Sequence, residues 1–491
     1  MNQAGGAIFR LLGQLARRFA VFPWLVRVVF GQPVAAVMGL TWKAAFRFRL
    51  FLVVSALLLA SVVALPLLIK DDGTARGFTQ ILLTYTLTTI SALLGLSTLW
   101  LACGTLARDI EECQIQVVAV KPVARWQIWL GKWLGLVSLN AALLALAGLC
   151  VFVLLQWRAT RLSPAEQEVL HREVLVARGS ARAPSLEADI DHDTDQVLKE
   201  RLQKNPVSNA DLNEVRKQVR EQVKAVYQVV PPGYMREWKI DMGSGRRLAA
   251  GRPFQVRIKF NSADRSPSGT FNGLWAVGAP PKTPVQRLEP MRLAPDTFHE
   301  FEVPSSLVDD TGILTLTFLN GNDTALLFPL EDGMEVLYRE GGFALNFARG
   351  LGIIFCWMAL LATIGLAAAS FLSFPVAAFF SMGMLTLALS SGTLANAVSE
   401  GTLGGYNAEK GTPGHTAVDT VAIPVFQGVL AVINLAKQFS PIESLSSGRS
   451  ITWGQLALAF SQIVLLLGGV FAVIGVAAFS RRELATAQGT Q

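Results

Sequence analysis

Long apolar runs recur along the chain and are separated by polar segments. The runs cover about 50–69, 81–106, 132–156, 346–371, 374–396 and 455–479. Each one approaches the roughly 20 residues that an α-helix needs to cross a hydrocarbon core about 30 Å thick. Uninterrupted apolar runs of this length are typical of membrane spans rather than of helices that bury one face. The pattern therefore predicts six transmembrane helices.

The residues between the third and fourth runs follow a different pattern. Ser163-Pro164-Ala165-Glu166 is a helix-start signal, because Ser163 and Glu166 stand at the two positions of a capping box and Pro164 at the first helical position. Apolar residues at three- and four-residue steps over 212–226 predict a second helix. Apolar and polar residues then alternate over 254–260 and 313–318, with turn signals between the short runs. This part of the chain predicts a β-sandwich-like arrangement beside helices.

We therefore expect a polytopic α-helical membrane protein with six transmembrane helices and an α+β extracytoplasmic insert that contains a β-sandwich-like part. The stretch 423–435 is apolar but too short to span, which favours re-entrant or surface helices before the last span. The predicted parts are a cytoplasmic amphipathic segment (1–49), transmembrane helices 1–3 with a coupling loop at 107–131 (50–156), the extracytoplasmic α+β domain (157–345), transmembrane helices 4–5 (346–396), extracytoplasmic re-entrant or surface helices (397–454), and transmembrane helix 6 with a cytoplasmic tail (455–491).

Composition excludes two classes of protein. Of the 491 residues, 52% are hydrophobic and 16% are charged, against roughly 25% charged in an ordinary soluble domain, so a single soluble globule is excluded. The net charge is +7, but 157–345 carries 24 Lys+Arg and 26 Asp+Glu, so the insert is not a basic nucleic-acid-binding domain. The four cysteines lie in or beside apolar runs and form neither a disulfide framework nor a zinc spacing.

Basic residues indicate the orientation of the spans. Seven Lys and Arg residues and no acidic residue stand between Arg10 and Arg49, so we expect the amino terminus in the cytoplasm. Alternation then places 107–131 and the carboxyl terminus inside and 157–345 outside, in a multi-pass protein of the cell inner (plasma) membrane. The first residues read as a basic amphipathic helix on the membrane surface. A cleaved signal peptide is the weaker interpretation, because no small-residue cleavage site follows a clean apolar stretch.

Chemical motifs are sparse in the insert. Asp189, Asp191, Asp193 and Glu200 partly match a calcium-binding loop, but Thr194 stands where that loop needs glycine. A solvated acidic loop that caps the next helix is the favoured interpretation of these residues. Two tryptophans of the insert, at positions 238 and 275, are expected in the core, with stacking on a sugar as the alternative. No nucleophile motif or paired carboxylates indicate an enzyme.

The polar loop between the second and third runs is the most informative segment. Acidic residues begin a short helix at 109–112, where they complement its positive end, and Pro122 ends that helix. Basic and aromatic residues then hold the start of the next span at the membrane interface. The predicted interface anchors are Trp126, Trp129, Lys132 and Trp133.

This loop resembles that of the permease subunits of type-2 ATP-binding-cassette (ABC) exporters. The family loop typically runs Glu-x-x-x-Gly-Thr, a Leu-Leu pair, Pro-Val-Ser-Arg and Leu-Gly-Lys. This chain has Pro122-Val123-Ala124-Arg125 followed by Leu130-Gly131-Lys132. It departs from the family with Cys113-Gln114 in place of Gly-Thr, with Val117-Val118 in place of the leucine pair, and with Ala124 in place of serine.

The resemblance implies a coupling helix that docks on a separate ABC ATPase subunit, in an assembly with a second permease copy or a homologue. The residues expected to couple to the ATPase are Asp109, Glu111, Glu112, Gln116, Lys121, Pro122 and Arg125. The sequence lacks Gly-x-x-x-x-Gly-Lys-Ser/Thr, so we expect no cofactor and no catalysis on this chain, with ATP and Mg on the partner subunit. The other expected partner is the lipid membrane.

One rival from a different functional class stays open. The chain could be a non-transporting membrane-anchored assembly or sensor protein, whose extracytoplasmic β-domain binds a partner or a glycan and whose spans serve as an anchor. The loop at 107–131 would then be an ordinary amphipathic connection between two spans. The residues of the spans do not indicate a transported substrate, because exporters of chemically different cargo have spans of similar composition.

Overall fold

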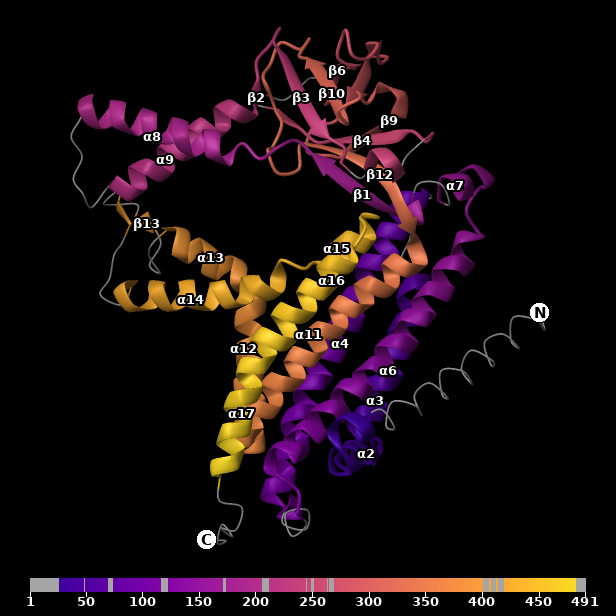
Figure 1. Cartoon of the computed structure of the whole chain (residues 1–491), viewed down its shortest axis with the longest axis vertical. Coiled ribbons are helices and arrows are strands. Elements are labelled where there is room, and N and C mark those ends of the chain that lie inside the picture. Colours follow the sequence, from indigo (N-terminus) through magenta and orange to yellow (C-terminus); the bar gives the residue numbers. More distant parts are fainter. Residues whose placement is uncertain are drawn as a thin grey trace. The chain divides into compact units, whose positions relative to one another are not determined.

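The computed structural model of the chain divides into two compact units (Figure 1). The helical unit comprises Met1–Leu175, Ala344–Ser447 and Ile451–Gln491, and the β-rich unit comprises Val176–Phe343 with Gly448–Ser450. The β-rich unit thus also takes in a three-residue segment from far along the chain. The structure describes residues 26–47, 49–68, 74–115, 122–170, 174–204, 212–243, 245–248, 251–262, 264, 269–400, 406–407, 412–413 and 419–482.

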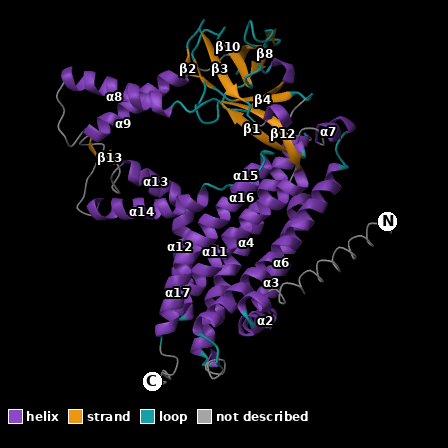
Figure 2. Cartoon of the chain, viewed as in Figure 1, coloured by secondary structure: helices purple, strands orange, loops and turns teal. Residues whose placement is uncertain are grey.

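The helical unit consists mainly of long helices, which Figure 2 colours purple. Its elements are α2 (Gln32–Arg47), α3 (Arg49–Leu68), α4 (Ala75–Glu111), α6 (Arg125–Ala159), α7 (Pro164–Val169), α11 (Phe343–Phe371), α12 (Phe374–Leu389), α13 (Ser391–Glu400), β13 (Tyr406–Asn407), β14 (Thr412–Pro413), α14 (Asp419–Lys437), α15 (Pro441–Ser446), α16 (Trp453–Ala459), the π-helical stretch η3 (Phe460–Gly468) and α17 (Gly469–Arg481).

Among the described residues, five helical segments are long and apolar enough to cross a membrane. They are Gly77–Glu111, Arg125–Ala159, Phe343–Phe371, Val421–Ser446 and Trp453–Arg481. The pair α12 and α13 passes the same test together but bends by 61° at Ser390, so the predicted span 374–396 is a broken helix. The sequence pattern indicates an apolar stretch at 423–435 that is too short to span a membrane. In the structure α14 extends beyond both ends of this stretch, and Val421–Ser446 is long enough to cross. Helix α3 covers the predicted first span.

Helix α2 packs closely against α6 through two glycines. A Cβ atom at Gly131 would lie 2.7 Å from the Cβ of Val37, and one at Gly135 would lie 2.6 Å from the Cβ of Thr41. Separations this short exclude a side chain at either position, so the two backbones approach as in small-xxx-small helix pairs. Trp42 also donates a hydrogen bond from Nε1 to Ser138 Oγ at 2.8 Å. The expectation for residues 1–25 lies outside the described residues.

The β-rich unit contains two main antiparallel sheets. Its elements are β1 (Val176–Arg182), α8 (Glu187–Lys204), α9 (Leu212–Gln228), β2 (Val229–Val230), β3 (Met235–Asp241), α10 (Gly245–Leu248), β4 (Phe254–Ile258), β5 (Asn261–Ser262), β6 (Phe271–Val277), β7 (Gln286–Arg287), β8 (Met291–Leu293), β9 (His299–Val303), η2 (Ser305–Leu307), β10 (Ile313–Leu319), β11 (Leu326–Leu327) and β12 (Met334–Gly342). One sheet has the order β1-β12-β4-β9, the other β3-β10-β6-β7 with β8 beside β6, and β2-β11-β5 form a third, smaller sheet.

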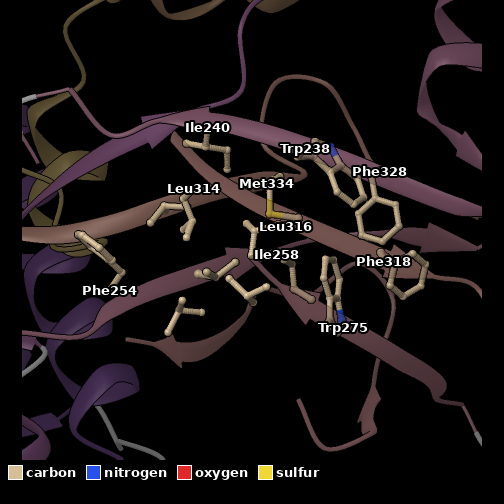
Figure 3. Close-up of a cluster of buried hydrophobic side chains, with 14 of the residues drawn as sticks. Trp238, Ile240, Phe254, Ile258, Trp275, Leu314, Leu316, Phe318, Phe328 and Met334 are labelled. Carbon is tan, nitrogen blue, oxygen red and sulfur yellow. The ribbon is translucent and has the colours of Figure 1, made fainter. Parts of the chain in front are cut away.

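The two main sheets enclose one aromatic-rich core (Figure 3). Trp238 on β3 and Trp275 on β6 stack at a ring-centroid distance of 5.9 Å, and Phe254 and Met334 come from the opposite sheet. Trp275 is 2% exposed. Burial of both tryptophans confirms the core interpretation and removes the sugar-stacking alternative. The period-two alternation at β4 and β10 arises because successive side chains of a strand point to opposite faces.

Helices α8 and α9 form an antiparallel hairpin. The acidic run that contains Asp189, Asp191 and Asp193 was interpreted from the sequence as a loop, and that interpretation was wrong. The run is part of α8 rather than a loop, so its carboxylates line a helix and do not encircle a cation. Asp191 pairs with Arg220 of α9 at 2.9 Å, and Asp193 accepts a hydrogen bond from the Tyr227 hydroxyl at 2.8 Å. In the described part of the chain, no group of three or more His, Cys, Asp and Glu side chains is arranged to hold a metal ion.

Candidate functional site

The end of α4 is connected to the start of α6 by a short ion pair. Lys132 Nζ lies 2.6 Å from Asp109 Oδ2 and donates a second hydrogen bond to the Thr105 carbonyl at 2.7 Å. The Lys132 side chain is 8% exposed and that of Asp109 is 36% exposed. Removal of the carboxylate would leave a buried ammonium group without a counter-charge, which is costly. This pair therefore fixes the distance between α4 and α6. The acidic residues at 109–112 end α4 rather than begin a new helix, so that sequence expectation was wrong, and the connection between the two helices is shorter than the predicted 107–131 loop.

Glu111 connects the same end of α4 to α12. Its Oε1 accepts a hydrogen bond from the backbone N–H of Phe374 at 2.8 Å. Ser373, the residue before α12, makes no side-chain cap, so Glu111 supplies the acceptor that a helix start needs. The Arg108 guanidinium lies 4.4 Å from the centre of the Phe374 ring, and Trp100 contacts that ring edge-on at 5.3 Å. The first turn of α12 is thus held by α4.

Arg125, from the Pro122-Val123-Ala124-Arg125 motif, binds the end of the last helix. Its Nη1 donates to the carbonyl oxygens of Phe479 at 3.0 Å, Ser480 at 2.7 Å and Arg482 at 2.7 Å. A guanidinium at this position satisfies carbonyl groups that have no intrahelical partner and complements the negative end of the helix dipole. Arg482 in turn donates to the Ser370 carbonyl of α11 at 3.3 Å. One end of α17 is therefore connected to α6 and α11.

The turn that follows α4 contains a strained residue. Cys113 has a φ of +57°, in the left-handed region that glycine occupies without steric cost. This conformation closes α4, because the Cys113 N–H bonds to the Ile110 carbonyl at 3.2 Å. A glycine at this position would adopt the same conformation without the steric cost. Cys113 is exposed, whereas Cys103 and Cys356 are buried.

The remaining predicted residues divide by exposure. Glu112 and Pro122 are exposed, and so is Gln114 between them. Gln116 and Lys121 lie outside the described residues. Of the expected interface anchors, Trp126 is exposed, while Trp129 is buried against α17 near Gly475.

Trp133 and Lys132 face neighbouring helices rather than open surface. Trp133 donates from Nε1 to Thr363 Oγ1 of α11 at 2.8 Å. Lys132 makes the ion pair with Asp109 described above. The structure therefore gives Asp109, Glu111, Arg125, Lys132 and Trp133 partners within the helical unit, and Glu111, Glu112 and Pro122 are exposed.

A second charged cluster lies in the β-rich unit and has no counterpart in the sequence analysis. Arg257 lies 2.8 Å from Glu300 and 3.2 Å from Glu335, which are its partners on the two adjacent strands. Arg178 pairs with Glu300 at 3.0 Å, and Arg449 pairs with Glu335 at 3.0 Å. Backbone hydrogen bonds on both sides of Arg449 attach the segment Gly448–Ser450 to β1.

Electrostatics keeps Glu335 ionised. Burial raises the pKa of Glu335, but the guanidinium groups of Arg449 and Arg257 outweigh that effect and hold the pKa below its ordinary value of 4.5. The side chain is 1% exposed, so solvent contributes little to its stabilisation. No local sequence signal identifies this cluster, because its members come from five separate segments. The pairing of β1, β12, β4 and β9 and the attachment of Gly448–Ser450 to β1 bring them together.

Comparison of the chain with protein-family models, with curated proteins and with solved structures gives no match.

Proposed function

We propose that this chain is the transmembrane permease subunit of an ATP-driven ABC exporter, and that the turn between α4 and α6 is its contact with a separate ATPase subunit. The observation that carries the proposal is the set of contacts at this turn. Asp109, Glu111 and Arg125 connect the adjoining ends of α4, α6, α12 and α17. A force applied to the turn would therefore act on four helices together.

The contacts suggest how ATP binding could move the helices. Closure of two ATPase subunits would displace the exposed surface of Glu112, Gln114 and Pro122. The ion pair at Asp109 and the cap at Arg125 would pass that displacement to α6 and α17 as a rigid-body movement. In this proposal the helical unit lies in the inner membrane with the α4–α6 turn and both termini in the cytoplasm, and the β-rich unit lies outside. Basic residues before α3 and at Arg481 and Arg482 support this orientation.

Co-purification with an ABC ATPase encoded beside this chain tests the proposal. We expect Glu112→Lys to weaken binding of the ATPase about tenfold, the size of one lost charge contact of about 1.4 kcal/mol. Glu302→Lys is the matched control, because Glu302 is an exposed carboxylate of the β-rich unit. Both variants should melt at the wild-type temperature, since neither side chain is buried.

Substitution of Arg125, whose partners lie within the helical unit, should affect ATP hydrolysis more than ATPase binding. Arg125→Ala should reduce the stimulation of ATP hydrolysis by more than it reduces binding, because it loosens α17 while the exposed turn stays in place. Wild-type ATPase binding and stimulation in both Glu112→Lys and Arg125→Ala would contradict the proposal. Such a result would favour the rival function as a membrane-anchored assembly or sensor protein.

A further inference from the structure

A small polar cluster lies among apolar helix faces at a point that the coupling contacts do not involve. Ser391 begins α13 directly after the 61° bend, and its hydroxyl accepts a hydrogen bond from Lys437 at the end of α14. The next residue, Gln438, donates its side-chain amide to Gln462 of η3. Three helical segments that are distant in the sequence therefore contribute to one cluster.

The charge of this cluster is unbalanced. Lys437 is exposed, and the hydroxyl of Ser391 is its only side-chain partner among the residues that the structure describes. No described carboxylate pairs with it. Gln438, the next residue along the chain, and Gln462 form a second hydrogen-bonded pair that supplies neutral amide groups. The cluster thus offers one positive charge and neutral polar groups, which is the chemistry that complements a carboxylate or phosphate oxygen.

The surroundings of the cluster are apolar and exposed. Leu389, at the end of α12, is 73% exposed, and Leu465, in η3, is 61% exposed. Figure 1 places α12, α14 and α17 on the same side of the helical unit. Of the candidate membrane segments, Val421–Ser446 has the smallest buried share and Trp453–Arg481 the next smallest. Apolar chains can therefore approach the polar cluster along these helices.

The position of the cluster along the helices matches one boundary of a bilayer. Helix α12 rises about 24 Å from Phe374 to Leu389, and a similar length of helix separates Gln462 from Phe479. A hydrocarbon core is about 30 Å thick, so the cluster would lie just inside the leaflet opposite to the α4–α6 turn. An ammonium group at that depth reaches the headgroup region, and it would meet the phosphate of a lipid there.

We propose that Ser391, Lys437, Gln438 and Gln462 form a binding site for the anionic headgroup of an amphiphile whose apolar chains lie on the exposed faces of α12 and η3. The inference rests on the proposed function, since it places these helices in a membrane, and it assigns anionic amphiphiles as the substrate class. The broken helix positions the site, because the bend allows Ser391 to meet a residue of α14.

Lipid retention by the full-length protein tests the site. The purified chain is equilibrated with micelles containing either phosphatidylglycerol or phosphatidylcholine, and the retained lipid is measured by native mass spectrometry. We expect the wild type to retain phosphatidylglycerol preferentially. Lys437→Gln should lower that preference about fivefold, the size expected for one lysine at an anionic membrane surface, and Lys437→Arg should keep it. Lys199→Gln is the matched control, because Lys199 is an exposed lysine of the β-rich unit.

A second variant and a competitor sharpen the result. Gln462→Leu removes an amide from the cluster and keeps the charge, so we expect a smaller loss of preference and an unchanged melting temperature. Competition by inorganic phosphate would assign the recognition to the phosphate group alone, and failure to compete would assign part of it to the apolar chains. Equal retention of the two lipids by the wild type, or wild-type preference in Lys437→Gln, would overturn the proposal.

The two proposals fail separately. Selective lipid retention without co-purification of an ABC ATPase would leave the site in place and contradict the proposed function. Co-purification and stimulation of the ATPase without lipid selectivity would contradict only the site.

Discussion

The two units of the chain use buried charge in different ways. In the helical unit, the two charged contacts beside the α4–α6 connection each join one helix end to one other helix: Asp109 meets Lys132, and Arg125 meets the last carbonyl groups of α17. In the β-rich unit, Glu300 and Glu335 are shared by guanidinium groups from the two strands β1 and β4 and from the segment Gly448–Ser450. The first arrangement connects elements that can move together, whereas the second holds adjacent strands in one register.

This difference predicts unequal effects of single substitutions. Loss of one member of the shared cluster leaves several buried charges incompletely paired, whereas loss of a helix-end contact leaves one. Because the chain has two units, unfolding is best followed by hydrogen exchange of separate peptides rather than by one global transition.

The largest effect is expected for Arg257→Ala. The substitution leaves Glu300 and Glu335 buried with fewer guanidinium partners, and it should destabilise the β-rich unit by about 4 kcal/mol. Hydrogen exchange should accelerate in peptides of β4, β9 and β12 and not in peptides of α6. Arg287→Ala, on an exposed edge strand, is the control and should leave exchange unchanged. Equal exchange in the two variants would contradict a structural role for the cluster.

A smaller loss is expected for Asp109→Ala in the helical unit. The ammonium group of Lys132 would keep only the Thr105 carbonyl, at a cost of about 2 kcal/mol, because Asp109 is already partly exposed. Peptides from the end of α4 and the start of α6 should exchange faster. The double variant Asp109→Ala/Lys132→Met should recover most of the stability, since it also removes the buried charge. No recovery would show that the ion pair is not the source of the effect.

Acid should destabilise the β-rich unit through Glu335. The pKa of Glu335 is lower in the folded protein than its ordinary value of 4.5, so its contribution to stability is complete above that pH. The contribution is lost as the pH falls below 4.5 and through the folded-state pKa, because protonation then removes the charge that Arg449 and Arg257 complement. We expect exchange in β12 to accelerate over this range in the wild type and to change less in Glu335→Gln. A flat wild-type profile below pH 4.5 would disagree with this assignment.

The smallest change in stability is expected for a substitution in the turn after α4. Cys113→Gly should stabilise the end of α4 by about 1 kcal/mol, because glycine adopts the left-handed conformation without steric cost. Slower exchange at the end of α4 would support backbone strain at Cys113. Faster exchange would mean that the thiol makes a contact that outweighs the strain.

The sequence predicts the elements of this fold better than their contacts. Apolar runs and period-two alternation locate most long helices and the strands β4 and β10, because both patterns report burial that follows from local geometry. The bend at Ser390 was not predicted, although the run Ser390-Ser391-Gly392-Thr393 is a break signal within the apolar segment 374–396. The helical state of Asp189, Asp191 and Asp193 was also missed, because partners on α9, beyond the acidic run itself, stabilise α8.

The candidate site was predicted as a segment but not as a set of contacts. The motif residues Asp109 and Arg125 were expected to face a partner subunit, and the structure gives them partners within the helical unit. Sequence alone cannot separate these roles, because a charged residue beside a span looks the same in either case. The distinction needs the packing of α4, α6, α12 and α17.

Labelling of Cys113 with a membrane-impermeant maleimide tests the central claim most directly, because this thiol lies in the exposed turn between α4 and α6. We predict that Cys113 stays unlabelled in intact cells and reacts in inside-out membrane vesicles, where the bound ATPase partner should slow the reaction. Cys113→Ser should abolish the signal, since Cys103 and Cys356 are buried and Cys150 is half-buried. Labelling of Cys113 in intact cells would place the turn outside and contradict coupling to a cytoplasmic ATPase.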